Sequence, residues 1–120
     1  MRKIFFPALV FLIGCGLACA QQPSHVSNFH GQIMDSMCAK TGGHSASAYK
    51  LTHTHTPKDC TLACVKDGSH FVLYNAKTKA TYKLDNQKMP RAFAGDNVVV
   101  HGTYDASSKT IHVENITPAR

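Results

Sequence analysis

The 120-residue sequence contains no tryptophan, only seven acidic residues and, after its first three residues, no two adjacent basic residues. The formal net charge of +6 falls to +4 without Arg2 and Lys3. The remaining positive charges are spread along the chain, with no aromatic residues interleaved among them. We therefore expect a solvated basic surface and no nucleic-acid binding.

Signatures of catalysis are also missing. The sequence has no Ser-His-Asp order, no phosphate-binding glycine loop, no paired-carboxylate signature and no Cys-x-x-Cys motif. Such patterns accompany nucleophilic catalysis, nucleotide binding and thioredoxin-like redox chemistry. We therefore do not expect an enzyme. Asp35 and Asp59 precede cysteines, and helix capping is the expected role of both.

The one long apolar run, Ile4 to Ala18, follows a short cationic start and is shorter than the about 20 residues of a membrane span. Ala18-Cys19-Ala20 matches a signal peptidase site, which predicts a signal peptide over residues 1–20. The mature chain would then be secreted or periplasmic. The alternative is a lipobox, Leu12 to Cys15, which would give a membrane-anchored lipoprotein modified at Cys15; no other partner is indicated.

The mature chain is short enough for a single domain, predicted over residues 29–120 after a flexible tether at 21–28. Alternating or β-rich segments predict five strands, at 29–35, 71–74, 80–84, 97–104 and 110–116. Residues 39–56 have little periodicity and predict a long loop. Thr56 and Pro57 predict the start of a helix that ends near Lys66, before Gly68.

These elements predict a mainly β fold: a small five-stranded OB-like antiparallel barrel with one short helix that carries Cys60 and Cys64. The pattern from Gly95 to Gly102, followed by a polar turn and a last strand, is similar to the end of an OB-type barrel. The helix departs from that pattern, because it lies between the first two strands. The expected core consists of apolar hairpin positions: Phe71, Leu73, Leu84, Val98, Val100, Ile111 and Val113.

Several motifs together resemble a family of small secreted bacterial proteins of unknown function. They are Asp35-x-x-Cys38, Cys60-x-x-x-Cys64-Val-Lys-x-Gly68, Phe71-Val-Leu-Tyr74, Val98-x-Val100-x-Gly102 and Ile111-x-Val113. The resemblance covers about residues 31–116, and the cysteine pattern is its most specific part. It implies export and a compact β-rich domain, and it implies no activity.

Cleavage before Gln21 leaves three cysteines, Cys38, Cys60 and Cys64. Outside the cytoplasm cysteines usually pair, so one interpretation is a disulfide between Cys38 and either Cys60 or Cys64. Such a bond would contribute about 3 kcal/mol in the chain-entropy model. A bond between Cys60 and Cys64 is disfavoured on a regular helix. The thiol left over could serve redox chemistry, with Cys60 the better placed near a helix N-terminus.

The second interpretation is a metal site. Cys60 and Cys64 lie one helical turn apart, Cys38 ends the first strand, and a loop histidine could complete four ligands for zinc or copper(I). His55, just before the helix, is the preferred fourth ligand, and His44 and His53 are alternates. Met34 or Met37 could add a soft ligand for copper. Two function classes therefore stay open: a metal-handling exported domain, or a disulfide-stabilised envelope module that binds partners without metal.

Overall fold

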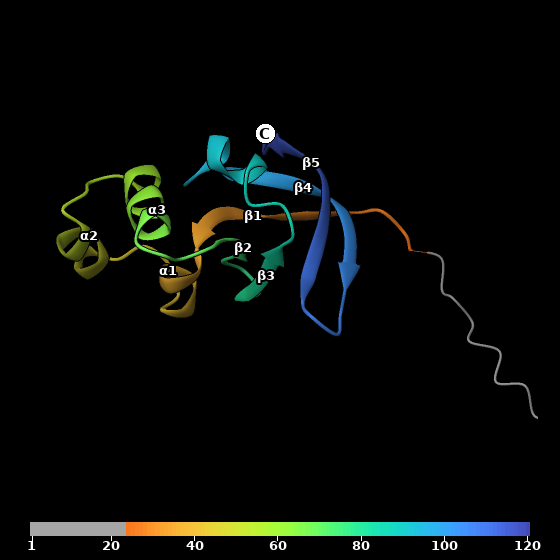
Figure 1. Ribbon diagram of the computed structural model, residues 1–120, viewed down its shortest axis with the longest axis horizontal. Helices are drawn as coiled ribbons and strands as arrows, with labels where there is room; N and C mark the ends of the chain where they lie inside the picture. Colours follow the sequence, from red (N-terminus) through yellow and green to blue (C-terminus); the bar gives the residue numbers. More distant parts are fainter. Residues whose placement is uncertain (1–23) are drawn as a thin grey trace, which may run out of the picture.

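The structure is a computed structural model that describes residues 24–120 (Figure 1). The predicted signal peptide, Cys15, Cys19 and the start of the predicted tether lie outside the described residues. The first strand, β1, begins at Ser27, two residues earlier than predicted, so it includes the end of that tether.

Five strands form a single sheet that closes in a ring, which confirms the mainly β prediction. They are β1 (Ser27–Asp35), β2 (Phe71–Asn75), β3 (Ala80–Leu84), β4 (Asn97–Asp105) and β5 (Thr110–Pro118). Each strand pairs with two neighbours in the order β1-β2-β3-β5-β4, and β4 pairs with β1 to close the ring. The predicted strand positions match within a few residues.

The predicted antiparallel sheet is wrong in one pair. Four of the pairings are antiparallel, but β3 and β5 run parallel, with Lys83 opposite Thr110 and Leu84 opposite Ile111. The cause is topological: β5 forms a hairpin with β4 and still has to reach β3 for the ring to close. The sheet is therefore mixed.

The helical content also exceeds the prediction of one short helix. α3 (Pro57–Lys66) is the predicted helix, but α1 (Ser36–Lys40) and α2 (Ala46–Thr52) occupy much of the segment predicted as a loop. A 3-10 helix, η1 (Met89–Phe93), precedes β4. Figure 1 shows α1, α2 and α3 together on one side of the strands, away from the β4–β5 turn. None of the helices within residues 24–120 is long and apolar enough to cross a membrane.

Gly95 fixes α3 against the strands. Its φ of +80° favours glycine, and a Cβ atom there would collide with the backbone of Pro57 and Lys58 at the start of α3. Its N–H donates to the carbonyl of Ile33 at 2.8 Å, and its carbonyl accepts from the Gln32 amide at 2.7 Å. The first turn of α3 is thereby held next to β1.

Two groups of buried side chains fill the molecule. The larger lies within the ring and contains all the predicted core residues, with Val113 only partly buried. Leu62 and Val65 of α3 pack against it. The smaller lies between the ring and the helices and comprises six buried residues: Met34, Cys38, Ala39, Cys60, Val72 and Tyr74. Two of the three described cysteines therefore lie in this second cluster.

Candidate metal centre

Cys38 is positioned by the junction of β1 and α1. Asp35 is the last residue of β1 and the N-cap of α1, and its Oδ1 accepts hydrogen bonds from the backbone N–H groups of Met37 (3.1 Å) and Cys38 (2.8 Å). Such a cap satisfies N–H groups that have no partner within the helix. Asp35 is fully buried and Cys38 is 3% exposed. The cap therefore holds the Cys38 thiol at an enclosed end of the strand ring.

α3 brings the other two thiols. Its N-cap is Thr56, whose hydroxyl oxygen accepts from the N–H of Asp59 at 3.1 Å, and Pro57 occupies the first turn, as predicted. Asp59 accepts in turn from the Thr56 hydroxyl. The expected capping role is therefore confirmed for Asp35, whereas Asp59 supports the Thr56 cap and is not itself the cap. Cys60 and Cys64 lie one turn apart on the buried face of this helix.

His44 reaches the thiols from the connection between α1 and α2. Its ring stacks on Tyr49 of α2, with centroids 5.9 Å apart and planes 6° apart. Its Nε2 lies 3.1 Å from the hydroxyl of the buried Thr61 on α3 and 3.9 Å from Asp35 Oδ2. Burial lowers the pKa of His44, and the Asp35 charge opposes that shift in part. A neutral imidazole, the form that binds metals, is therefore favoured.

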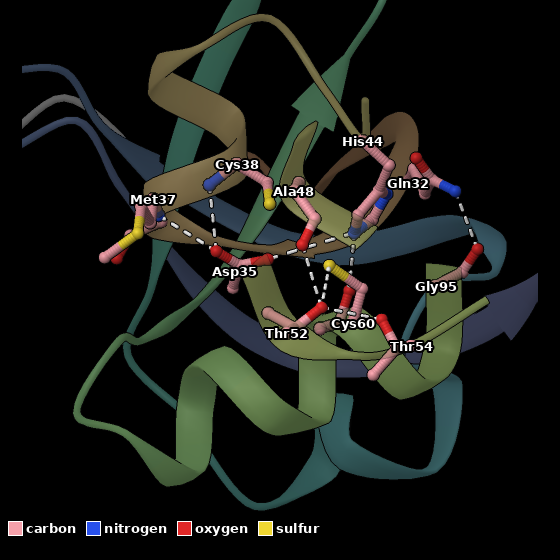
Figure 2. Close-up of polar contacts among 12 residues, drawn as sticks. Gln32, Asp35, Met37, Cys38, His44, Ala48, Thr52, Thr54, Cys60 and Gly95 are labelled. Atoms are coloured by element: carbon pink, nitrogen blue, oxygen red, sulfur yellow. Dashed lines mark hydrogen bonds and ion pairs between the residues drawn. The ribbon is translucent and has the colours of Figure 1, made fainter. Parts of the chain in front are cut away.

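Two overlapping groups of potential ligands result. Figure 2 shows the side chains of Asp35, Cys38, His44 and Cys60 close together. In one, atoms of Cys38, His44 and Cys60 all lie within 4.8 Å of one another; in the other, the same holds for Asp35, Cys38 and Cys64. Two sulfur ligands of a tetrahedral zinc ion, each at about 2.3 Å, would lie about 3.8 Å apart. The side chains of each group are thus within a small adjustment of positions suited to one ion, and Cys38 belongs to both groups.

The protonation states of the thiols follow from their surroundings. Burial, reinforced by the neighbouring Asp35 carboxylate, raises the pKa of Cys38 well above its ordinary value. Burial and the Asp35 charge raise the pKa of Cys64 to about 11. Without a metal these sulfurs are neutral thiols at pH 7, and a metal ion has to displace their protons to bind.

Asp35 supplies an independent sign that a cation fits. Its Oδ2 is buried and has no hydrogen-bond partner among the described residues, although Oδ1 is satisfied by the cap. A buried polar atom without a partner is costly and calls for an explanation, such as an ion. Since Oδ2 faces His44, a metal bound to these side chains would offset its charge.

The structure brings together only part of the predicted ligand set. Cys38, Cys60, Cys64 and His44 belong to the two groups. The preferred fourth ligand, His55, and the alternate His53 are both exposed and belong to neither group. Met37 is 55% exposed, whereas Met34 packs with Cys38 and Cys60.

The predicted disulfide between Cys38 and Cys60 or Cys64 is not formed: the three described cysteines are free thiols. Their sulfurs lie at separations suited to a shared ion, and a disulfide requires about 2.05 Å.

Two residues beside the thiols, Asp35 and Thr52, were not predicted from the sequence to belong to the site. Asp35 was expected only as a cap; the clue was its place three residues before Cys38, which puts the cap oxygen beside the cysteine at the third helical position. Thr52 at the end of α2 donates its hydroxyl to Ala48 O at 2.9 Å and lies 3.6 Å from the sulfur of Cys60. No sequence pattern indicated Thr52, because α2 itself was not predicted.

The chain matches no protein-family model, and no curated protein and no solved structure is significantly similar to it. The resemblance to small secreted bacterial proteins therefore stays an expectation, and the case for function depends on the geometry of the site.

Proposed function

We propose that this chain is an exported metal-binding domain whose Cys/His group holds one thiophilic ion. The observation that carries the proposal is that the buried Cys38 sulfur lies within 4.8 Å of ligand atoms of His44 and Cys60 in one group and of Asp35 and Cys64 in the other. Beside it, Asp35 Oδ2 is a buried oxygen without a partner among the described residues. Cys38 would be the central ligand, with Cys60, Cys64 and His44 completing the set. Asp35 would bind the ion directly or balance its charge.

Zinc is the ion that this ligand set favours. Sulfur, nitrogen and oxygen donors together suit Zn²⁺, whereas copper(I) prefers sulfur alone. The buried carboxylate adds a further negative charge, and a dication offsets that charge better than a monocation. Copper(I) is the second candidate, with Met34 as the nearby soft donor.

The proposed architecture is an OB-like barrel. The strand order β1-β2-β3-β5-β4 and the parallel β3–β5 pair support it. The main helix, α3, lies between β1 and β2, and the segment between β3 and β4 carries only η1. In this chain the first connection has thus expanded into three helices, of which α1 and α3 carry the cysteines of the proposed site.

Export is proposed from the N-terminal pattern, with cleavage before Gln21 or modification at Cys15. A bound zinc ion would be compatible with export, because cysteine thiolates that coordinate zinc are protected from oxidation to disulfides. The alternative function is an envelope module that binds partners and is stabilised by a disulfide. Its support is the position of the Cys38 sulfur, within 4.8 Å of those of both Cys60 and Cys64.

Two measurements on a single preparation distinguish the metal-binding domain from the disulfide-stabilised module. The protein is purified from the exported fraction under non-reducing conditions, and its metal content and free thiols are measured together. A metal domain carries one zinc ion per chain and releases three titratable thiols from Cys38, Cys60 and Cys64 after denaturation with a chelator. A metal-free protein with one free thiol would overturn the proposal and favour the disulfide module.

A further inference from the structure

A pocket of about 700 Å³ lies beside the candidate metal centre and has so far been given no role. Its walls come from β1, from the connection that carries His44 and from the β2–β3 turn, and the C-terminal end of the chain closes one side. Of the five side chains in the two ligand groups, His44 is the one that also lines this pocket. The pocket therefore reaches the metal centre through the imidazole.

The thiols themselves are closed to solvent. Cys60 is 0% exposed, Cys38 3% and Cys64 8%. An ion that enters from solvent needs a donor at the boundary, and His44 occupies that position. Met34 also lines the pocket and packs with Cys38 and Cys60, so a thioether sulfur continues the path inward.

The pocket wall is mainly apolar but carries several polar side chains, and one of them has a second unsatisfied group. The Tyr74 hydroxyl is buried and has no hydrogen-bond partner among residues 24–120, and Tyr74 lines the pocket. Gln32, Asn75 and Asn97 line it as well. These groups suit a polar ligand with oxygen atoms, which both amides and hydroxyls can bind by donating hydrogen bonds.

Size and charge indicate how the ion arrives. A volume of about 700 Å³ lies in the range of small-molecule sites and greatly exceeds the roughly 30 Å³ that one water occupies. The exposed Lys77 lies at the rim, where it disfavours a bare dication and favours an anionic complex.

We propose that this pocket is the loading site of the metal centre: it receives zinc bound to a small carboxylate chelator, and His44 passes the ion to the buried thiols. The inference rests on the proposed metal function. In the transfer, the bonds from zinc to the chelator carboxylates break, and bonds to the His44 nitrogen and then to the sulfurs form. Each sulfur that binds gives up one proton to the departing carboxylate or to solvent.

The two hairpins supply a matched pair of test variants. Ala76 is the first residue of the turn after β2, and Ala106 is the first residue of the corresponding turn after β4; both are exposed, and Lys79 and Lys109 adopt similar positive φ values. Ala76 lines the pocket and Ala106 does not. Ala76→Trp therefore fills the pocket, and Ala106→Trp controls for a bulky side chain in such a turn. Ala119→Trp fills the pocket from its other side.

Equilibrium zinc affinity is measured first, and then the rate of loading from zinc citrate by stopped-flow thiolate absorbance. We expect Ala76→Trp and Ala119→Trp to slow loading and release by at least about tenfold with unchanged affinity, and Ala106→Trp to match the wild type. Wild-type loading rates in both pocket variants would overturn the route. If the wild type binds no zinc at all, the metal function and the loading site fail together, which distinguishes the two outcomes.

A separate variant tests whether the zinc carrier is anionic. Lys77→Glu should slow loading from zinc citrate and leave loading from hydrated zinc unchanged or faster, because the charge at the rim is reversed. Equal slowing with both zinc sources would contradict an anionic carrier.

Discussion

Asp35 Oδ2 and His44 Nε2 lie 3.9 Å apart, and their side chains are 0% and 6% exposed. The same carboxylate caps α1 through Oδ1, so one residue joins the end of β1, the start of the helix that holds Cys38, and the imidazole. In the proposed metal centre, Asp35 would therefore couple folding of this junction to metal binding.

Asp35→Asn tests the carboxylate apart from its capping role. Asparagine caps helices about as well as aspartate, so α1 should persist, whereas the negative charge beside the ion is lost. We expect zinc affinity to fall about 10–100-fold, as is usual when a partner of a metal ligand is removed. Isothermal titration calorimetry measures the affinity. Asp59→Asn, at the exposed first turn of α3, should leave it unchanged; equal losses in both variants would contradict a role for Asp35.

Cysteine and histidine variants test the membership of the site. Cys38→Ser should weaken zinc binding most, by more than about 100-fold, because Cys38 belongs to both ligand groups. Cys60→Ser and Cys64→Ser should weaken it strongly, and His44→Ala more mildly. His55→Ala is the matched control, since His55 is exposed and outside both groups. Competition with a chromophoric chelator gives the affinities. A larger loss in His55→Ala than in His44→Ala would refute the assignment.

Zinc affinity should rise with pH. The raised pKa values of Cys38 and Cys64 keep both thiols protonated at neutral pH, so each sulfur that binds releases a proton. Affinity then increases up to about tenfold per pH unit for each proton released. Calorimetry in buffers of different ionisation enthalpy counts those protons. About one released proton per bound sulfur is expected. A zinc affinity that does not change between pH 6 and pH 8 would mean that the thiols are not the ligands.

The metal-free protein should lose stability in alkali. The pKa of Cys64 is about 11 when folded and has an ordinary value of 9.0, so the unfolded thiol ionises first. The stabilising contribution is complete below pH 9.0 and is lost as pH rises towards about 11. Thermal unfolding of the apo protein at several pH values measures the loss, which should be smaller in Cys64→Ala.

The core predicts a simple stability contrast. Leu73 and Ile111 are fully buried inside the strand ring, whereas Leu51 on α2 is 75% exposed. Leu73→Ala and Ile111→Ala should each lower the free energy of unfolding by about 2–5 kcal/mol. Leu51→Ala should change it by less than about 0.5 kcal/mol. Urea denaturation compares the three variants. An unchanged free energy of unfolding in Leu73→Ala would contradict the assignment of Leu73 to the inward face of β2.

Local signals in the sequence were enough for α3 and for the hairpins. Thr56, Pro57 and Asp59 mark the helix start, and alternating apolar residues mark the strands, because capping and period-two burial act over a few residues. The one-turn spacing on α3 also led us to expect the three cysteines near one another, and the Cys38 sulfur lies within 4.8 Å of those of Cys60 and Cys64.

Other features depend on contacts across the whole chain. α2 has no buried residue and is shorter than two full turns, so its sequence has no apolar stripe that would predict a helix. The parallel pairing of β3 with β5 results from closure of the ring. His44 lies in the site because α1 ends in a turn through Gly42 and Gly43, both with positive φ, that returns the chain towards α3. Sequence proximity to α3 favoured His55 instead, and proximity along the chain did not decide the geometry.

Cobalt(II) titration of the fully reduced mature chain tests the central claim most directly, because a cobalt ion bound by thiolates absorbs in the near ultraviolet through charge transfer from sulfur. We predict saturation at one ion per chain, with strong thiolate-to-cobalt absorption that zinc abolishes and that Cys38→Ser greatly weakens. Absence of this absorption in the wild-type protein at saturating cobalt, or full absorption in Cys38→Ser, would contradict a metal centre at these residues.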